Sequence, residues 1–344
     1  MASVLQQKLL VVTGKGGVGK TTVAAAVGLL AADRGLRTII VEVGDQHRLS
    51  DLFGFGPPSP GVERELQKGL SSISIDPDRA LMEWLQALGG RISGRVLASS
   101  STFQYFAAAA PGAKELVGMV KIWELTQQQR WRGRSAGYDL VVLDAPATGH
   151  ALGMLSSPHT FGAIARVGPI AGQAQQIGQL LADPARCGYL AVAHASEMAV
   201  TETFELQDAL RRELGRELEA VIVNGLLPRR FTEAELRRLT RFSDGRPATD
   251  ARAAAPVKQS ALHGPSTSYR GPERVGATDA VTDAVADSAA RAAHAVHDRA
   301  RLQRNQVARL RRRGLDVLAV PYQFAPELDL PSIRRIADHL GRKL

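Results

Sequence analysis

Residues 14–22 have the sequence GKGGVGKTT, and this stretch decides the fold. It satisfies G-x-x-x-x-G-K-[ST], the pattern of a glycine-rich loop that binds phosphate groups. The apolar residues 8–13 (KLLVVT) before it predict a buried strand, and residues 21–34 (TTVAAAVGLLAADR) after it predict a helix that ends at Gly35. Residues 37–43 (RTIIVEV) predict a second strand. Together these segments predict a βαβ unit with a right-handed crossover.

The loop contains the groups that a bound nucleoside triphosphate requires. Its glycines can adopt backbone angles closed to other residues, so that successive N–H groups point inward as a nest for anions. Lys20 can reach the β- and γ-phosphates, the Thr21 hydroxyl can ligate Mg²⁺, and Thr22 can touch the α-phosphate. With ATP and Mg²⁺ as ligands, the binding residues expected here are Gly14, Gly16, Gly17, Val18, Gly19, Lys20, Thr21 and Thr22.

Strands and helices alternate over most of the chain, which predicts an α/β fold with a doubly wound, mostly parallel sheet. Further strands are expected at residues 70–75, 138–144, 188–194, 218–224 and 315–320, and helices at 77–88, 201–214, 279–313 and 331–344. We expect one domain over residues 1–344, with a mostly helical insert at about 76–132. Residues of about 244–278 are rich in Ala, Pro, Gly, Ser and Asp without a sustained period, which predicts a disordered insert.

Composition narrows the class of protein. The net charge is +9, but only eight of the 43 basic residues are lysine, and a general Arg and Ala bias explains the charge better than nucleic-acid binding does. No apolar run is long enough for a membrane span, and the N-terminus lacks the pattern of a secretion signal. Cys187 is the only cysteine, which excludes an intrachain disulfide and fits a reducing compartment. We therefore expect a cytoplasmic protein that binds no nucleic acid.

A second lysine, Lys15, directly follows the first glycine of the loop, where an ordinary phosphate loop has no use for it. The arrangement G-K-G-G-V-G-K-T-T resembles the deviant Walker A family of ATPases. That family includes the MinD and ParA proteins, nitrogenase iron protein and the ArsA-type ATPases. The resemblance implies a dimer in which Lys15 crosses the interface and stabilises charge at the partner's nucleotide. A solvated loop lysine is the alternative.

The expected strand 138–144 (YDLVVLD) ends in an acid, so Asp144 is the expected second ligand of Mg²⁺. Residues 144–150 (DAPATGH) resemble switch II of the ArsA-type ATPases, D-T-A-P-T-G-H, with the last three residues in register and 145–147 permuted. This resemblance implies that Gly149 lets the backbone approach a γ-phosphate, whose loss releases the loop. It covers nearly the whole chain outside residues 244–278.

Two strand ends resemble the adenine side of the same family. Asn224 ends the expected strand 218–224, and Pro321 follows the last expected strand. The resemblance implies that both residues lie beside the adenine ring. An asparagine at the end of a strand is also a common turn residue.

Switch I departs from the family pattern. The family has D-P-A-H-x-L-S-D, whose first Asp positions the attacking water, whereas residues 44–51 here are GDQHRLSD. Gly44 stands at the Asp position and Asp45 comes one residue later, a shift of about 3.5 Å that also redirects the side chain. Three interpretations stay open: the loop bends so that Asp45 serves, the subunit hydrolyses ATP poorly, or it pairs with a related subunit whose switch I is intact. The expected catalytic residues are Lys15, Lys20 and Asp45.

The residues that form client sites in the family can also be looked for in this sequence. One cysteine supplies neither the cysteine triad that binds arsenite in ArsA-type pumps nor the cysteine pair that holds zinc in targeting ATPases, so neither site is expected. Targeting members bind a client's apolar helix between their helical inserts. The apolar residues of the insert either line such a groove or pack its own core, and the core fits most of them better. They are Leu81, Trp84, Leu85, Phe103, Tyr105, Phe106, Met119, Ile122 and Trp123.

The expected function is that of an ArsA-type switch ATPase. ATP closes a homodimer, or a heterodimer with a related subunit, and hydrolysis opens it to act on a client protein or membrane partner. One alternative is a catalytically weak, nucleotide-binding subunit of a heterodimer. Another is a MinD- or ParA-like positioning ATPase, which requires an amphipathic membrane helix or a basic dimer surface. Residues 332–344 are only weakly amphipathic.

Overall fold

A computed structural model of the chain describes residues 4–44, 48–99, 112–131, 137–165, 169–243, 276–325 and 327–344. Its strands are β1 (Leu9–Gly14), β2 (Thr38–Val43), β3 (Arg64–Gln67), β4 (Leu70–Ile75), β5 (Leu140–Ala147), β6 (Cys187–Ala193), β7 (Ala220–Leu226) and β8 (Val317–Pro321). Its helices are η1 (Val4–Gln6), α1 (Lys20–Asp33), α2 (Arg48–Leu52), α3 (Pro77–Ser99), α5 (Ala113–Thr126), α6 (Thr148–Ala165), α7 (Pro169–Ala182), α8 (Glu197–Leu214), α9 (Glu233–Ser243), α10 (Gly276–Arg312) and α11 (Leu330–Gly341).

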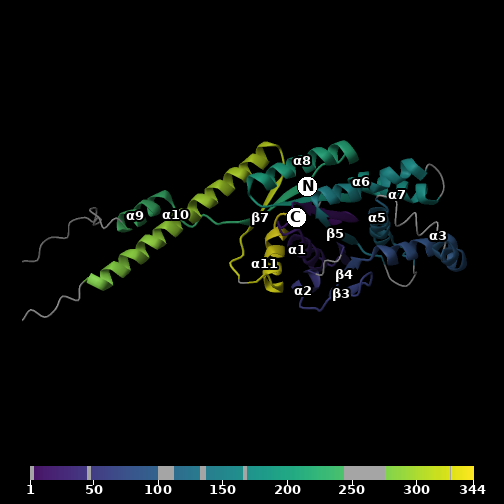
Figure 1. Ribbon diagram of the computed structural model, residues 1–344, viewed down its shortest axis with the longest axis horizontal. Coiled ribbons are helices and arrows are strands. Elements are labelled where there is room, and N and C mark those ends of the chain that lie inside the picture. Colours follow the sequence, from purple (N-terminus) through teal and green to yellow (C-terminus); the bar gives the residue numbers. More distant parts are fainter. Residues whose placement is uncertain are drawn as a thin grey trace, which may run out of the picture. The chain divides into compact units, whose positions relative to one another are not determined.

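The strands form one eight-stranded sheet in the order β3-β4-β2-β5-β1-β6-β7-β8 (Figure 1). Only β3 runs antiparallel to its neighbour. The predicted α/β class with a doubly wound, mostly parallel sheet is therefore confirmed. The antiparallel β3 was not predicted, because only Leu66 of its four residues is apolar and buried, so the sequence shows no apolar run.

The central strand β1 places the glycine-rich loop at the middle of the sheet. All six of its residues are buried, between β5 on one side and β6 on the other. The chain continues from β1 to β2 in one direction, and later strands are added in the opposite direction. Ligands of doubly wound sheets bind at the carboxyl ends of the strands where this reversal occurs. The loop that follows β1 lies at such a reversal.

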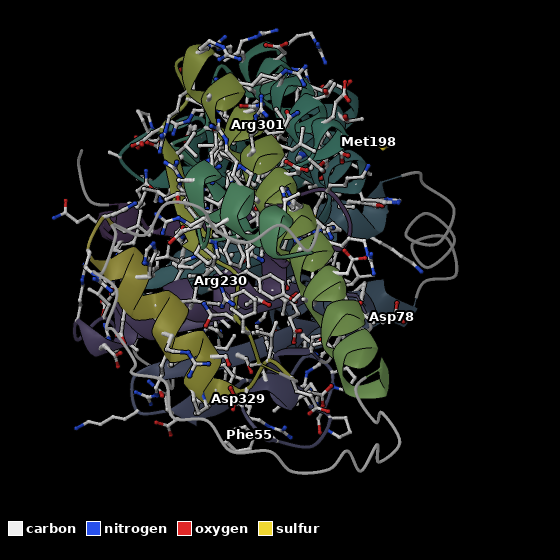
Figure 2. The ribbon with its side chains drawn as sticks, turned by 90° about the vertical axis from the view of Figure 1, so that its left-hand side faces the viewer. Phe55, Asp78, Met198, Arg230, Arg301 and Asp329 are labelled. Atoms are coloured by element: carbon white, nitrogen blue, oxygen red, sulfur yellow. The ribbon has the colours of Figure 1, made fainter. Side chains whose placement is uncertain are left out.

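Local capping explains several helix ends that the sequence predicts. Gly35, at φ +86°, follows the last turn of α1 in the left-handed conformation expected of a terminating glycine. The Asp76 carboxylate accepts the Arg79 N–H at 2.9 Å and so caps α3. Asp329 likewise accepts the Ser332 N–H at 2.9 Å at the start of α11 (Figure 2). These caps fix where the two helices begin.

Helix α6 continues through Pro158, which lacks the N–H that an α-helix would donate to Met154. The Ser157 hydroxyl donates to the Met154 carbonyl oxygen instead, at 2.8 Å. The side chain thus satisfies the acceptor that the proline leaves free. None of the helices in the described part of the chain has the length and apolar character needed to cross a bilayer.

The expected helical insert is represented by α3 and α5. Trp84, Leu85, Met119 and Ile122 are buried in it. Two further groove candidates, Leu81 and Trp123, are partly buried against the core, while Phe103, Tyr105 and Phe106 lie outside the described residues. The candidates that the structure describes therefore pack the interior, as the alternative interpretation of this stretch predicts.

A buried ion cluster holds this region together. Lys121 Nζ lies 2.8 Å from Glu83 and 3.0 Å from Glu124, which joins α3 to α5. Arg130 donates to Glu124 and to Glu63, each at 2.6 Å. Burial alone would raise the pKa of Glu124, but its bonds to Arg130 and Lys121 hold that pKa below its ordinary value. The cluster is therefore charged, and losing one member leaves a buried charge unpaired.

The chain forms two compact units, one of residues 1–226 with 303–344 and one of residues 227–302. In the second unit, α9 opens with a capping box in which Thr232 N donates to Glu235 at 2.7 Å and Glu235 N donates to the Thr232 hydroxyl at 3.3 Å. Of the expected disordered insert, residues 244–275 lie outside the described residues, and α10 begins at Gly276, slightly before the predicted start. The single-domain division of the chain stays a prediction.

Candidate functional site

Two glycines of the phosphate loop occupy positions that exclude a side chain. Gly14 has φ +145°, and a Cβ there would overlap the carbonyl oxygen of Val192 in β6. Gly19 has φ +90°, and a Cβ there would overlap the Asn224 amide nitrogen. That amide donates to the Val18 carbonyl oxygen at 2.9 Å. The loop is thus held against β6 and β7 by contacts that only glycine permits.

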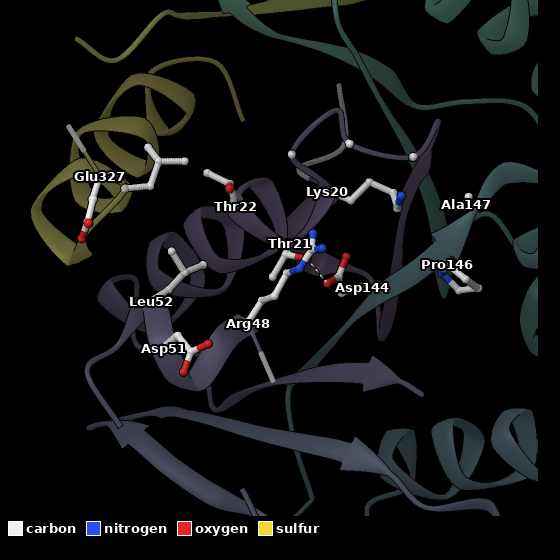
Figure 3. Close-up of a pocket in the computed structure, with 14 residues that line it drawn as sticks. Lys20, Thr21, Thr22, Arg48, Asp51, Leu52, Asp144, Pro146, Ala147 and Glu327 are labelled. Atoms are coloured by element: carbon white, nitrogen blue, oxygen red, sulfur yellow. Dashed lines mark hydrogen bonds between the residues drawn. The ribbon is translucent and has the colours of Figure 1, made fainter. Parts of the chain in front are cut away.

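A cavity of about 580 Å³ lies over this loop (Figure 3), within the usual size range of small-molecule sites. Its walls come from the loop and α1, from α2, from the end of β5 and from the segment before α11. The sequence-predicted residues that line it are Gly16, Gly17, Gly19, Lys20, Thr21, Thr22 and Asp144. Segments that are far apart in the sequence therefore meet where the motif predicts a nucleotide.

Thr21 and Asp144 form the part of this cavity that fits a divalent cation. The Thr21 hydroxyl donates to Asp144 Oδ2 at 2.6 Å. The other carboxylate oxygen, Oδ1, is buried and has no hydrogen-bond partner among the described residues. Burial raises the pKa of Asp144 to about 6, against the opposing effects of Thr21, Lys20 and Arg48. A buried carboxylate oxygen without a partner, beside a hydroxyl, supplies the hard oxygen ligands that Mg²⁺ prefers.

Lys20 begins α1 and curls back over the loop, where its Nζ donates to the Lys15 carbonyl oxygen at 3.2 Å. Burial lowers the pKa of Lys20, while Asp144 and Glu202 oppose that effect. Burial disfavours the charged form of Lys20, so an added anion would stabilise that charge. Lys20 lies at the N-terminus of α1, which is where phosphate groups bind in such loops.

Lys15, the second lysine of the loop, binds an acidic residue of its own chain. Its Nζ forms an ion pair with Glu202 Oε2 of α8 at 2.8 Å, and the two side chains are 38% and 25% exposed. Lys15 is therefore paired within its own chain and still partly exposed, which leaves the alternative of a solvated loop lysine open. The role of Lys15 across a dimer interface stays a prediction.

The structure describes Gly44 and residues 48–51 of switch I, and residues 45–47 lie outside the described part. Gly44 follows β2 at φ +85°, and its carbonyl oxygen accepts a hydrogen bond from the Ser74 hydroxyl at 3.1 Å. Asp45, the predicted substitute for the missing family Asp, lies outside the described residues. Its catalytic role therefore stays a prediction.

Two switch I neighbours were missed by the sequence analysis. Glu42 is buried in β2 and accepts the Leu49 N–H at 3.2 Å, and burial raises its pKa to about 7. Arg48, the first residue of α2, lines the cavity opposite the loop. A signal for Glu42 was present, because an acid inside the apolar run TIIVEV needs a partner. Arg48 stood at the variable position of the switch I pattern, which gave no reason to single it out.

Switch II joins β5 to α6 without an intervening loop. β5 extends to Ala147, three residues beyond the predicted end, and α6 begins at Thr148. The Thr148 hydroxyl is buried without a hydrogen-bond partner among the described residues. No atom lies within 4 Å of a Cβ built on Gly149. The strand therefore carries Asp144 and the start of α6 as one continuous segment.

The two predicted adenine-side residues lie in neighbouring strands: Asn224 is two residues before the end of β7, which runs past its predicted end, and Pro321 is the last residue of β8. Asn224 holds the phosphate loop through Val18, as described above. The Tyr322 N–H donates to the Leu226 carbonyl oxygen at 3.0 Å and so fixes the chain after Pro321. Both residues are at the carboxyl edge of the sheet, and their contact with adenine stays a prediction.

Comparison with known proteins adds an independent line of support. The family profile of the anion-transporting ATPases matches residues 7–173, which include the phosphate loop and both switch segments. The ATPase BagA of Mycobacterium tuberculosis is 30% identical over 238 residues, which cover 67% of this chain and 68% of that protein.

Two further relatives match shorter shares of this chain. A protein of Halobacterium salinarum described as an arsenical pump-driving ATPase is 26% identical over 249 residues, 66% of this chain and 37% of its own. The ATPase GET3 of Mycosarcoma maydis is 31% identical over 193 residues, 52% of this chain and 53% of its own. All three relatives are named as ATPases.

Proposed function

This chain belongs to the ArsA-type family of anion-transporting ATPases, and on that basis we propose that it is a Mg²⁺-dependent ATPase that works as a dimeric switch. One observation carries the proposal. The Thr21 hydroxyl and the buried, partly unpaired Asp144 carboxylate meet at the end of a glycine-rich loop, inside a cavity of suitable size. Phosphate groups and a divalent cation are the ligands that such a combination serves.

The residues of the cavity have distinct roles in this proposal. The loop N–H groups and the N-terminus of α1 bind phosphate oxygens, and Lys20 neutralises their charge. Thr21 and Asp144 hold Mg²⁺, which would neutralise charge on the β- and γ-phosphates when bound. Asn224 keeps the loop closed through Val18 and contributes to the adenine side together with Pro321.

The dimer completes the site. In this proposal Lys15 leaves Glu202 and reaches the nucleotide of the partner subunit, where it stabilises the charge that develops during hydrolysis. ATP then favours the closed dimer and hydrolysis favours the open one, so that the cycle acts on a client protein or a membrane partner.

The test is Mg²⁺-dependent ATP binding and steady-state hydrolysis by the purified chain, with Lys20→Ala as the test variant. Lys68→Ala is the matched control, because Lys68 is exposed in the turn before β4, at the opposite edge of the sheet from the loop. We expect Lys20→Ala to abolish turnover, Lys68→Ala to retain it, and chelation of Mg²⁺ to suppress it. A wild-type chain that binds no ATP would refute the proposal.

A second candidate is a nucleotide-holding subunit of a heterodimer that hydrolyses ATP poorly on its own. Its support is Gly44, which provides no carboxylate at the family's switch I position and takes a φ of +85°. Tight Mg²⁺–ATP binding without turnover, relieved by adding a related subunit, would favour this candidate. Turnover by the isolated chain would exclude it.

The positioning-ATPase alternative is less well supported. A membrane-binding C-terminal helix needs an unpartnered apolar face, whereas Ile333, Ile336 and Leu340 of α11 are buried. The helix also contacts α1, where Arg34 donates to the Gly341 carbonyl oxygen at 2.9 Å. We therefore propose a client or membrane protein, and not the lipid surface itself, as the partner class.

A further inference from the structure

Arg48 is a cation of the cavity that neither the motif nor the switch patterns assign. It opens α2, directly after the switch I loop, and lines the cavity across from the phosphate loop. Figure 3 shows its guanidinium directed toward Thr21 and Asp144. Arg48 and Lys20 thus approach the same volume from opposite sides.

The Arg48 side chain is exposed. Within the described residues it forms no hydrogen bond and no ion pair, whereas other arginines of the fold do. Arg37, for example, binds the Asp139 carboxylate through two nitrogens at 3.2 and 3.1 Å. Asp144, the acid toward which the guanidinium is directed in Figure 3, is already bonded to Thr21. The described acids that line the cavity, Asp51, Asp144 and Glu327, form no ion pair with Arg48, so its guanidinium is available for an anionic ligand.

The backbone that carries Arg48 is fixed by buried contacts. The next residue, Leu49, is fully buried and donates its N–H to the Glu42 carboxylate at 3.2 Å. Ser50 is also buried, which leaves α2 little freedom to turn away from the cavity. Glu42 is therefore a positioning residue that holds the start of α2, and Arg48 is the side chain that it presents.

We propose that Arg48 binds the terminal phosphates of the nucleotide in its own subunit, as a cation supplied in cis. The inference rests on the proposed function, because it requires a nucleotide in this cavity. A guanidinium has a planar set of donors that matches phosphate oxygens, and it forms two bonds where a lysine forms one. Arg48 lines the same cavity as Thr21 and Asp144, the residues that would hold Mg²⁺ and so bring the terminal phosphates to this side. It contributes positive charge in the switch I segment, in which Gly44 stands at the position of the family's carboxylate.

The test is the affinity for a non-hydrolysable ATP analogue with Mg²⁺, measured by titration calorimetry on the full chain, so that no turnover is needed. The variants are Arg48→Gln, which removes the charge, and Arg48→Lys, which keeps it without the planar fork. Arg37→Gln is the control, because it removes the same charge at the amino edge of the sheet, before β2. Because the Arg48 side chain is exposed, thermal unfolding should match the wild type in the first two variants.

We expect Arg48→Gln to weaken binding roughly 10- to 100-fold, the range for hydrogen bonds to charged groups. Arg48→Lys should recover part of that loss, and Arg37→Gln should leave binding unchanged. Affinity of Arg48→Gln within twofold of the wild type would overturn the inference, as would an equal loss in Arg37→Gln. If the wild type itself binds no nucleotide, the proposed function fails and this inference falls with it. The two failures are therefore distinguishable.

Discussion

Replacing Glu202 with glutamine removes the charge that holds Lys15 in its own subunit. The ion pair spans 2.8 Å, and its two side chains are 38% and 25% exposed. Pairs at this level of exposure contribute at most about 1 kcal/mol, because solvent screens them. If each lysine must leave its glutamate before it can reach the partner's nucleotide, a homodimer breaks two such pairs. Glu202→Gln should then favour the ATP-bound dimer by up to about 2 kcal/mol, or about 30-fold in the dimer dissociation constant.

The assay is sedimentation over a concentration series, with Mg²⁺ and a non-hydrolysable ATP analogue, to obtain the dimer dissociation constant. Glu205→Gln is the matched control, because Glu205 is an exposed acid on the same helix, three residues further along. A Lys15→Ala background supplies the second control, since Glu202→Gln should have no effect when the lysine is absent. Unchanged or weaker dimerisation in Glu202→Gln would refute the idea that Glu202 competes with the interface for Lys15.

Three further predictions concern the fold. Glu124→Gln leaves buried cations without their partner, so it should lower the free energy of unfolding in urea by about 3–5 kcal/mol, whereas the exposed Glu65→Gln should change it by less than about 0.5 kcal/mol. Gly14→Ala should cost at least about 2 kcal/mol by the same measurement, because the new methyl group overlaps the Val192 carbonyl oxygen at a positive φ; a cost below 1 kcal/mol would mean that the loop relaxes freely. Burial raises the pKa of the Cys187 thiol to about 12, so the native chain should resist thiol reagents at pH 8 and react only as it unfolds; rapid labelling of the native chain would contradict this.

The phosphate-loop half of the sheet could be predicted because its chemistry is local. A glycine-rich turn, a buried strand on one side and a helix on the other specify their own conformation, and β1, α1 and β2 lie where the sequence places them. The strand predicted at residues 70–75 coincides with β4. Asp144 was found because an acid at the end of an apolar strand is conspicuous.

The parts that were missed differ in the signal that their sequences carry. α6 carries apolar residues on all sides and contains Pro158, so it shows neither an amphipathic stripe nor an uninterrupted helical pattern. α9 was missed although its capping box, T-x-x-E at residues 232–235, was visible in the sequence. Arg48 and Glu42 could not be assigned, because their roles depend on a long-range arrangement between α2 and the cavity. The partner of Lys15 came from α8, some 187 residues along the chain.

The direct passage from β5 into α6 has a mechanical consequence. With no loop at Thr148, a shift of the strand end is not absorbed by slack backbone and becomes a tilt of the helix. α6 has 18 residues, so its length is about 27 Å, and a tilt of about 10° at its base would move its far end by about 5 Å. The hydroxyl of Ser157 keeps the two halves of this lever tied across Pro158. A small displacement of the β5 end at the cavity would therefore become a larger displacement at the far end of α6.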